Sequence, residues 1–203
     1  MNVNSCETAL HELISDLNKF KSNKGIALLL FIDFRKAFEL VDSRILLRKL
    51  VYYGFDNDSI ELITNYFNDR SQTVKIKNKN SNFKEIKLGC VQGGTISPLL
   101  FLIFINYLAF LLKEEKISCK MFADDTTLYD SDTEINPLIS KFKKKLEPLF
   151  DWCTCNRLDI NWSKTFFMFI TNKHIAKKLP SEIKILNFNV KVVDSFKLLL
   201  TIN

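Results

Sequence analysis

Two adjacent aspartates, Asp124 and Asp125, lie between two segments that favour β-strands, in the stretch KMFADDTTLY. Two like charges about 4 Å apart repel each other by roughly 1 kcal/mol in water and by about 4 kcal/mol at an effective dielectric of 20. Such a pair is either solvated in a turn or stabilised by a bound cation. The two aspartates are therefore either turn residues or part of a site for a divalent metal.

A third carboxylate, Asp33, follows the apolar run IALLLFI. A continuous apolar run of this length is typical of a strand buried on both faces, which predicts that Asp33 lies at the end of a central strand. If that strand neighbours the strands around the paired aspartates, three carboxylates meet at one sheet edge. Oxygen ligands without a nearby histidine favour Mg²⁺ or Mn²⁺, and two such ions can promote phosphoryl transfer.

Sequence patterns predict helices and strands in mixed order around these acids. Because antiparallel hairpins occur among the strands, we expect an α+β fold rather than a doubly wound sheet. The predicted helices are one from a capping box at Asn4 and Glu7 to near Gly25, one capped by Asp42 or Ser43, one capped by Asp56 or Asp58, a long apolar helix with Ser97 as N-cap and Pro98 at its first position, and a lysine-rich helix over 133–153. The predicted strands are a β-hairpin over 72–88, a pair around 124–125, a strand over 165–170 and short strands over 183–202.

The composition is that of a globular protein with a packed core. The chain has 203 residues, 47% of them hydrophobic, and a formal charge of +6 that favours a polyanionic partner without requiring one. Five cysteines match neither a disulfide framework nor a zinc motif, so we expect free thiols in a reducing compartment. The apolar run over 96–112 contains Pro98 and Asn106 and is shorter than the roughly 20 residues of a membrane span. It predicts a buried helix.

Four motifs in order resemble the palm of a reverse transcriptase of the non-LTR retrotransposon (LINE, jockey-like) type. They are FIDFRKAFELVD, GCVQGGTISPLLFLIFINYL, KMFADDTTLY and LDINWSKTFFMFI, and the resemblance covers nearly all of residues 1–203. It implies a polymerase palm with a mainly antiparallel sheet backed by helices, and RNA-directed DNA polymerase activity. The implied partners are an RNA template, a DNA primer, deoxynucleoside triphosphates and Mg²⁺ or Mn²⁺, in the nucleus or cytoplasm and without a membrane.

The resemblance also implies roles for the acids and for one lysine. Asp33 and Asp124 would ligate two magnesium ions, and Asp125 would support that site. Lys164 would protonate or neutralise the pyrophosphate leaving group. Taken alone, each aspartate is also compatible with a cap or turn, and the lysine with a solvated surface charge.

Further implied residues surround the nucleotide and the primer. Phe34 and Phe38 would line the nucleotide pocket, with Phe38 as the gate against a ribose 2′ hydroxyl, although a core position explains a phenylalanine as well. Gln92 and Gly93 would touch the nucleotide and template, because glycine allows close backbone approach. The alternative is an ordinary turn before a helix. Phe122 and Ala123 would shape the hairpin under the primer end, and a phosphate backbone would run along Lys141, Lys143, Lys144 and Lys145, which also fit a solvated helix face.

Several positions depart from the family pattern. Glu39, Ser43 and Val91 stand where the family has aspartate, histidine and proline, and no basic finger strands or thumb accompany the palm. We therefore expect a partial palm with truncated fingers, and an inactive remnant that at most binds nucleic acid is the alternative. A metal-dependent hydrolase is a third hypothesis, but only His11 and His174 are available as histidine bases.

Overall fold

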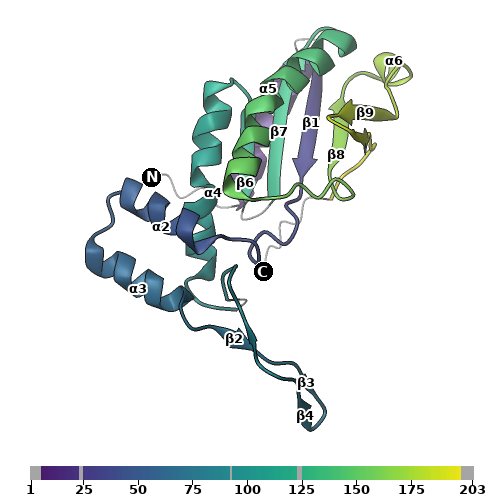
Figure 1. Ribbon diagram of the computed structural model, residues 1–203. Helices are drawn as coiled ribbons and strands as arrows, with labels where there is room; N and C mark the ends of the chain where they lie inside the picture. The colour runs from purple at the N-terminus through teal and green to yellow at the C-terminus, as the bar shows by residue number, and fades with distance from the viewer. Residues whose placement is uncertain (1–5, 23–24, 92, 123–124, 198–203) are drawn as a thin grey trace. The chain divides into compact units, whose positions relative to one another are not determined.

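The computed structural model describes residues 6–22, 25–91, 93–122 and 125–197 (Figure 1). The chain forms two compact units. The first unit comprises residues 1–35, 108–152 and 159–203, and the second comprises residues 36–107 and 153–158.

The first unit is built on a four-stranded sheet in which every neighbouring pair is antiparallel. The strand order is β6-β7-β1-β8, and Figure 1 shows β1 and β7 side by side. This arrangement confirms the predicted α+β fold with a mainly antiparallel sheet. The strand bounds are β1 Ile26–Ile32, β6 Ser118–Phe122, β7 Asp125–Asp132 and β8 Phe166–Ile170.

Helices cover both faces of this sheet, so β1 is buried along its whole length. On one face, Leu13 of α1 (Cys6–Ser22) packs with Leu29, Phe31 and Tyr129. Tyr129 also donates a hydrogen bond of 2.8 Å from its hydroxyl to Asp16 of the same helix. The residues alternating with these on β1 face α5 (Ile135–Asn156), where the rings of Phe142 and Phe167 lie 6.2 Å apart.

The remainder of the first unit contains a short helix and a hairpin beyond β8. They are α6 Lys173–Ala176, β9 Glu182–Ile185 and β10 Phe188–Lys191. The ring of Phe188 stacks on Trp162 with a centroid distance of 4.7 Å. The strands were predicted from the sequence, whereas α6 was not.

The second unit begins with two helices whose N-terminal caps were predicted. Asp42 accepts a hydrogen bond of 2.9 Å from the Arg44 amide at the start of α2, and Asp56 accepts one of 2.7 Å from the Ser59 amide at the start of α3. The bounds are α2 Ser43–Tyr52, α3 Asn57–Phe67, β2 Ser71–Gln72, β3 Lys75–Ile76, β4 Lys79–Asn80 and β5 Lys84–Glu85. Strands β2 to β5 form the expected hairpin as two short ladders.

Asp42 is a buried acid that is paired with two arginines. Its side chain is 2% exposed and lies 2.6 Å from Arg157 and 3.3 Å from Arg44. Burial acts to raise the pKa of this carboxyl, but the hydrogen bonds from Arg44 and the charges of both arginines outweigh it and lower the pKa. The charged carboxylate is therefore the form that caps α2.

Helix α4 (Ser97–Glu114) is long and apolar enough to cross a membrane by length and composition alone. One face is buried, as predicted, and includes Phe101, Phe104 and Leu108. The opposite face exposes large apolar side chains, among them Leu99 and Phe110. The prediction of a buried helix therefore holds for one face of α4.

The cysteines that the structure describes with their side chains are free thiols, as expected: Cys90, Cys119, Cys153 and Cys155. Burial raises the pKa of Cys90 to about 11, with the charge of Arg70 acting in the opposite direction. Because the thiolate is the reactive form, Cys90 is an unreactive packing residue at neutral pH.

Lys49 on α2 provides a test of this packing by pH. Its Nζ donates to the Phe104 carbonyl at 2.5 Å, and burial lowers its pKa from 10.5 to about 8. Between these pH values the unfolded chain binds more protons at this site, so its contribution to the free energy of unfolding rises with pH. We expect Lys49→Met to remove that rise, measured by urea unfolding from pH 7 to 10.5 as the difference from the wild type. Arg48→Met, at an exposed position of the same helix, is the control. If the difference in unfolding free energy between Lys49→Met and the wild type did not change with pH, this assignment would be wrong.

Candidate active site

Asp33 and Asp125 lie next to each other at one end of the sheet. The register of β1 with β7 ends at the pair Ile32 and Thr126, so Asp33 follows directly and is beside Asp125. Both line one cavity of about 320 Å³, together with Lys164. The expected meeting of the strand ends is confirmed for these two acids, whereas Ala123 and Asp124 lie outside the described residues.

Aromatic rings form one wall of this cavity, which we call the carboxylate cavity. Phe31 stacks on Phe196 with a centroid distance of 4.0 Å and an interplanar angle of 7°. Phe166 lies 5.9 Å from the same ring. The next residue, Lys197, also lines the cavity and adds a second cation to Lys164. Neither Phe196 nor Lys197 was identified from the sequence, because the tail gave only a strand pattern.

Asn161 holds Asp33 through two hydrogen bonds. Its side-chain Nδ2 donates to Asp33 Oδ2 at 2.8 Å, and its amide donates to the Asp33 carbonyl at 2.8 Å. The hydroxyl of Ser163 donates to Asn161 Oδ1 at 2.7 Å, which fixes the orientation of the amide group. Asn161 was missed in the sequence, although it lies three residues before Lys164 in LDINWSK. It positions one carboxylate oxygen of the candidate site.

The donors in the carboxylate cavity suit a hard divalent cation. Its lining includes two carboxylates, no histidine and no cysteine, and oxygen ligands favour Mg²⁺ or Mn²⁺ over zinc. The Oγ1 atom of Thr126 is buried beside them and has no hydrogen-bond partner within the described structure. No group of three or more metal-binding side chains occurs among the described residues. A third carboxylate at this edge would be that of Asp124, which lies outside them.

The predicted nucleotide-contacting phenylalanines are not among the residues that line the carboxylate cavity. Phe34 is 2% exposed in the core and forms a bridge with Ile160. Phe38 belongs to the second unit, where its ring lies 4.5 Å from Phe101. Gln92 lies outside the described residues, and Phe122 ends β6 opposite Asp125.

Within the second unit, the Phe38 segment is joined directly to the glycine-rich loop 89–94. The amides of Gly89 and Cys90 donate to the carbonyls of Val41 and Phe38, each at 2.8 Å. Gly89 has a φ of 84°, and a Cβ atom there would lie 2.6 to 2.8 Å from the backbone of Glu39. Only glycine permits this approach. The sequence indicated a loop but not this contact.

Arg70 and Tyr66 also bind this loop. Nη1 of Arg70 donates to the Gly89 carbonyl at 2.7 Å, and the Val91 amide donates to the Tyr66 hydroxyl at 2.9 Å. Ser97, predicted as a helix cap, uses its hydroxyl differently: it donates to the Val91 carbonyl at 2.5 Å and lies 2.9 Å from the Tyr66 hydroxyl. These bonds hold the loop at Gly89 and Val91, while Gly93 adopts a φ of 76° with no atom near its missing Cβ.

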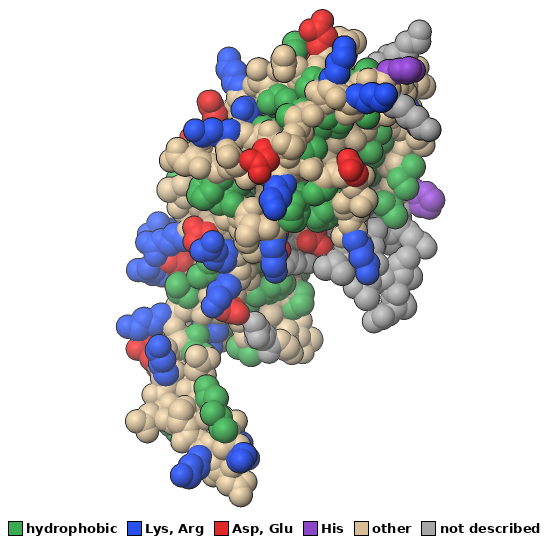
Figure 2. Space-filling view, turned by 90° about the vertical axis from the view of Figure 1, so that its right-hand side faces the viewer, with side chains coloured by type: hydrophobic (Ala, Val, Ile, Leu, Met, Phe, Trp, Pro, Cys, Tyr) green, Lys and Arg blue, Asp and Glu red, His purple; other side chains and the backbone are tan. Residues whose placement is uncertain are grey.

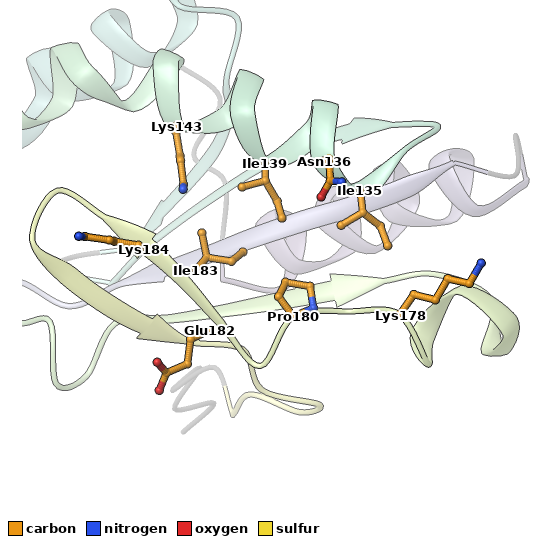
Figure 3. Close-up of a pocket in the computed structure, with 9 residues that line it drawn as sticks. All are labelled: Ile135, Asn136, Ile139, Lys143, Lys178, Pro180, Glu182, Ile183 and Lys184. Atoms are coloured by element: carbon orange, nitrogen blue, oxygen red, sulfur yellow. The ribbon is translucent and has the colours of Figure 1, made fainter.

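Three of the four lysines of α5 lie in two different environments. Lys145 and Lys141 lie 2.6 and 3.3 Å from Asp130, so they are paired with an acid of β7. Lys143 lines a second cavity of about 460 Å³ between α5 and β9. Figure 3 shows Ile139 and Ile183 facing each other across it. The acids of the carboxylate cavity are not among its lining residues, so it is a separate feature.

Comparison with known proteins identifies the fold and the family. The family model described as "Reverse transcriptase (RNA-dependent DNA polymerase)" matches residues 2–195. The apo telomerase from Candida tropicalis, truncated from its C-terminal domain, has a similar structure, with a TM-score of 0.62 at 15% identity. That match covers 93% of this chain and 39% of the telomerase chain, and it shows the fold.

Curated relatives are polymerases of mobile elements. The retrovirus-related Pol polyprotein from type-1 retrotransposable element R2 of Popillia japonica is 30% identical over 115 residues, which is 51% of this chain and 19% of that protein. The probable RNA-directed DNA polymerase from transposon BS of Drosophila melanogaster is 25% identical over 178 residues, 82% of this chain and 19% of that protein. The chain therefore spans about a fifth of the length of the curated relatives it matches.

Gly89 and Gly54 form a matched pair for testing the close approach at the loop. Both have positive φ, but a Cβ at Gly54 would have no atom within 4 Å. We expect Gly54→Ala to cost about 1 kcal/mol of unfolding free energy through backbone strain alone. Gly89→Ala adds a backbone collision and should cost at least about 2 kcal/mol more. Urea unfolding of both variants measures the difference, and equal costs would show that the Glu39 contact is unimportant.

Proposed function

Because this chain belongs to the reverse transcriptase family and is of the non-LTR retrotransposon type, we propose that it is the palm of an RNA-directed DNA polymerase. The observation that carries the proposal is the placement of Asp33, Asp125 and Lys164 around one cavity at the end of β1. Its substrates would be a DNA primer, an RNA template and deoxynucleoside triphosphates. One solved relative, telomerase from Candida tropicalis, is in complex with a TWJ fragment of telomeric RNA, which supports an RNA partner.

The reaction joins the primer 3′ oxygen to the α-phosphorus of the nucleotide and breaks the bond to pyrophosphate. Reverse transcriptases use a divalent metal, for which we propose Mg²⁺, with Mn²⁺ as the alternative. Two such ions, when bound, would lower the charge on the phosphates and activate the attacking oxygen. Asp33, Asp124 and Asp125 would hold these ions, with Asp33 and Asp125 at adjacent strand ends. Asn161 keeps the Asp33 carboxylate in one orientation.

Two cations of the chain lie beside these acids. Lys164 and Lys197 line the same cavity. Their positive charges would attract the polyphosphate of an incoming nucleotide there. We assign Lys164 to neutralising or protonating the departing pyrophosphate. Phe38, Gln92 and Gly93 are proposed to contact the nucleotide. Phe122 and Ala123 are proposed to shape the hairpin under the primer end.

Primer extension by the full chain on an RNA template tests the proposal. We expect Asp33→Asn and Asp125→Asn each to lower the rate at least about 1,000-fold, because a metal ligand contributes several kcal/mol to such a reaction. Asp151→Asn, which makes the same charge change on an exposed face of α5, should leave the rate unchanged. Absence of extension by the wild type with both Mg²⁺ and Mn²⁺ would refute polymerase activity and favour a silent nucleic-acid-binding chain.

Asn161 should act on the metal through Asp33. We expect Asn161→Ala to weaken Mn²⁺ binding about 10- to 100-fold, because ligands that lose their supporting hydrogen bonds bind metal less tightly. The free-ion signal in electron paramagnetic resonance measures this affinity without catalysis. Asn189→Ala, on an exposed position of β10, is the control. Equal Mn²⁺ affinity in the two variants would mean that Asn161 has only a structural role.

A further inference from the structure

The hairpin over residues 71–88, here called the arm, is exposed along almost its whole length. Its base is held by a hydrogen bond of 2.8 Å from the Ile86 amide to the Arg70 carbonyl. Its middle is held by the Val74 amide, which donates to the Ser81 hydroxyl at 2.9 Å. Figure 1 shows the arm extending away from α3 within the second unit. A two-stranded hairpin without a covering layer is marginally stable in water, so a ligand that covers it would stabilise it.

The arm is strongly basic. It contains five lysines and one acid, Glu85, whose carboxylate lies 3.5 Å from Lys87. Figure 2 shows basic side chains gathered at the end of the arm. The other lysines have no ion pair with any described residue, and they are Lys75, Lys77, Lys79 and Lys84. The partner that fits this surface is therefore a polyanion.

Apolar side chains lie among these cations. Val74 is 59% exposed, Ile76 is 68% exposed and Phe83 is 78% exposed. Because Ile76 pairs with Lys79, the side chains of Val74, Ile76 and Lys79 are on the same face of the arm. This face lines a hollow of about 750 Å³ that also includes Lys77. Apolar and cationic groups thus alternate within one surface.

We propose that the arm binds single-stranded nucleic acid. The lysines of the arm can neutralise the phosphates of a strand, and the exposed ring of Phe83 provides a face for an unpaired base to stack on. A duplex keeps its base faces inside the helix and would leave the apolar side chains uncovered. The inference goes beyond the proposed function, because the arm needs no metal and no catalysis to bind a strand.

The salt dependence of binding tests the lysines. The full chain is titrated against a fluorescent RNA of about 12 nucleotides and its DNA equivalent between roughly 50 and 300 mM salt. Removing one lysine–phosphate interaction lowers the slope of log affinity against log salt by about 0.7, so replacing Lys75, Lys77, Lys79 and Lys84 by Gln should lower it by up to about 3. The control removes the same charge from exposed lysines elsewhere, by replacing Lys19, Lys21, Lys177 and Lys178 with Gln. Equal slopes for the two variants would overturn the proposal.

A substitution at Phe83 tests base stacking separately from charge, because it leaves the lysines of the arm unchanged. Phe83→Ala should weaken strand binding at least about fivefold, the lower limit of base stacking on an aromatic ring, with no change of salt slope. Leu62→Ala, which truncates an exposed apolar residue of α3, should have no effect. An RNA duplex of the same sequence should compete less well than the single strand. Equal competition, or wild-type binding by Phe83→Ala, would overturn the assignment to single strands.

These outcomes are independent of polymerase activity. If Asp33→Asn binds the strand with wild-type affinity and fails only in extension, the arm and the carboxylate cavity have separate roles. If no variant extends a primer but the arm lysines still set the salt slope, the inference holds and the proposed function fails. If the primer is extended and the arm variants bind like their controls, the inference fails alone.

Discussion

Strand β1 is buried on both faces between β7 and β8, and the candidate site depends on this position. Its seven residues are all buried, and its antiparallel register with β7 continues directly into Asp33 and Asp125. A slip of one residue would turn the apolar side chains of one face toward the other and would also separate the two acids. The spacing of the two carboxylates therefore depends on the register of β1 with β7.

Much of the fold could be predicted from local signals. Asp42 and Asp56 cap helices where expected, and the apolar run before Asp33 forms the central strand. These features depend on residues within a few positions of one another. The pairing of β1 with β7 instead joins residues about a hundred positions apart, so local patterns did not predict that these two strands are neighbours. The order of the four motifs, which resembles that of a known palm, favoured this pairing.

The parts of the site that escaped prediction are those set by tertiary contact. In the sequence Asn161 is an ordinary polar residue, and only the structure shows that its side-chain amide donates to Asp33. Gly89 is one of several loop glycines in the sequence, and only the structure shows the backbone of Glu39 beside it. Lys145 fits a phosphate-tracking role by composition, but the adjacent Asp130 already pairs with it. In each case the role of the residue is determined by contact with a residue that is distant in sequence.

The position of β1 also affects how the chain is made. Its partner β8 is synthesised more than 130 residues later. At about 5 to 20 residues per second, ribosomal synthesis takes roughly 7 to 27 s to reach that partner. During this interval a fully apolar segment lacks at least one of the two neighbours that later shield it. The nascent chain thus passes through a period in which it is prone to aggregation and gains from chaperone binding.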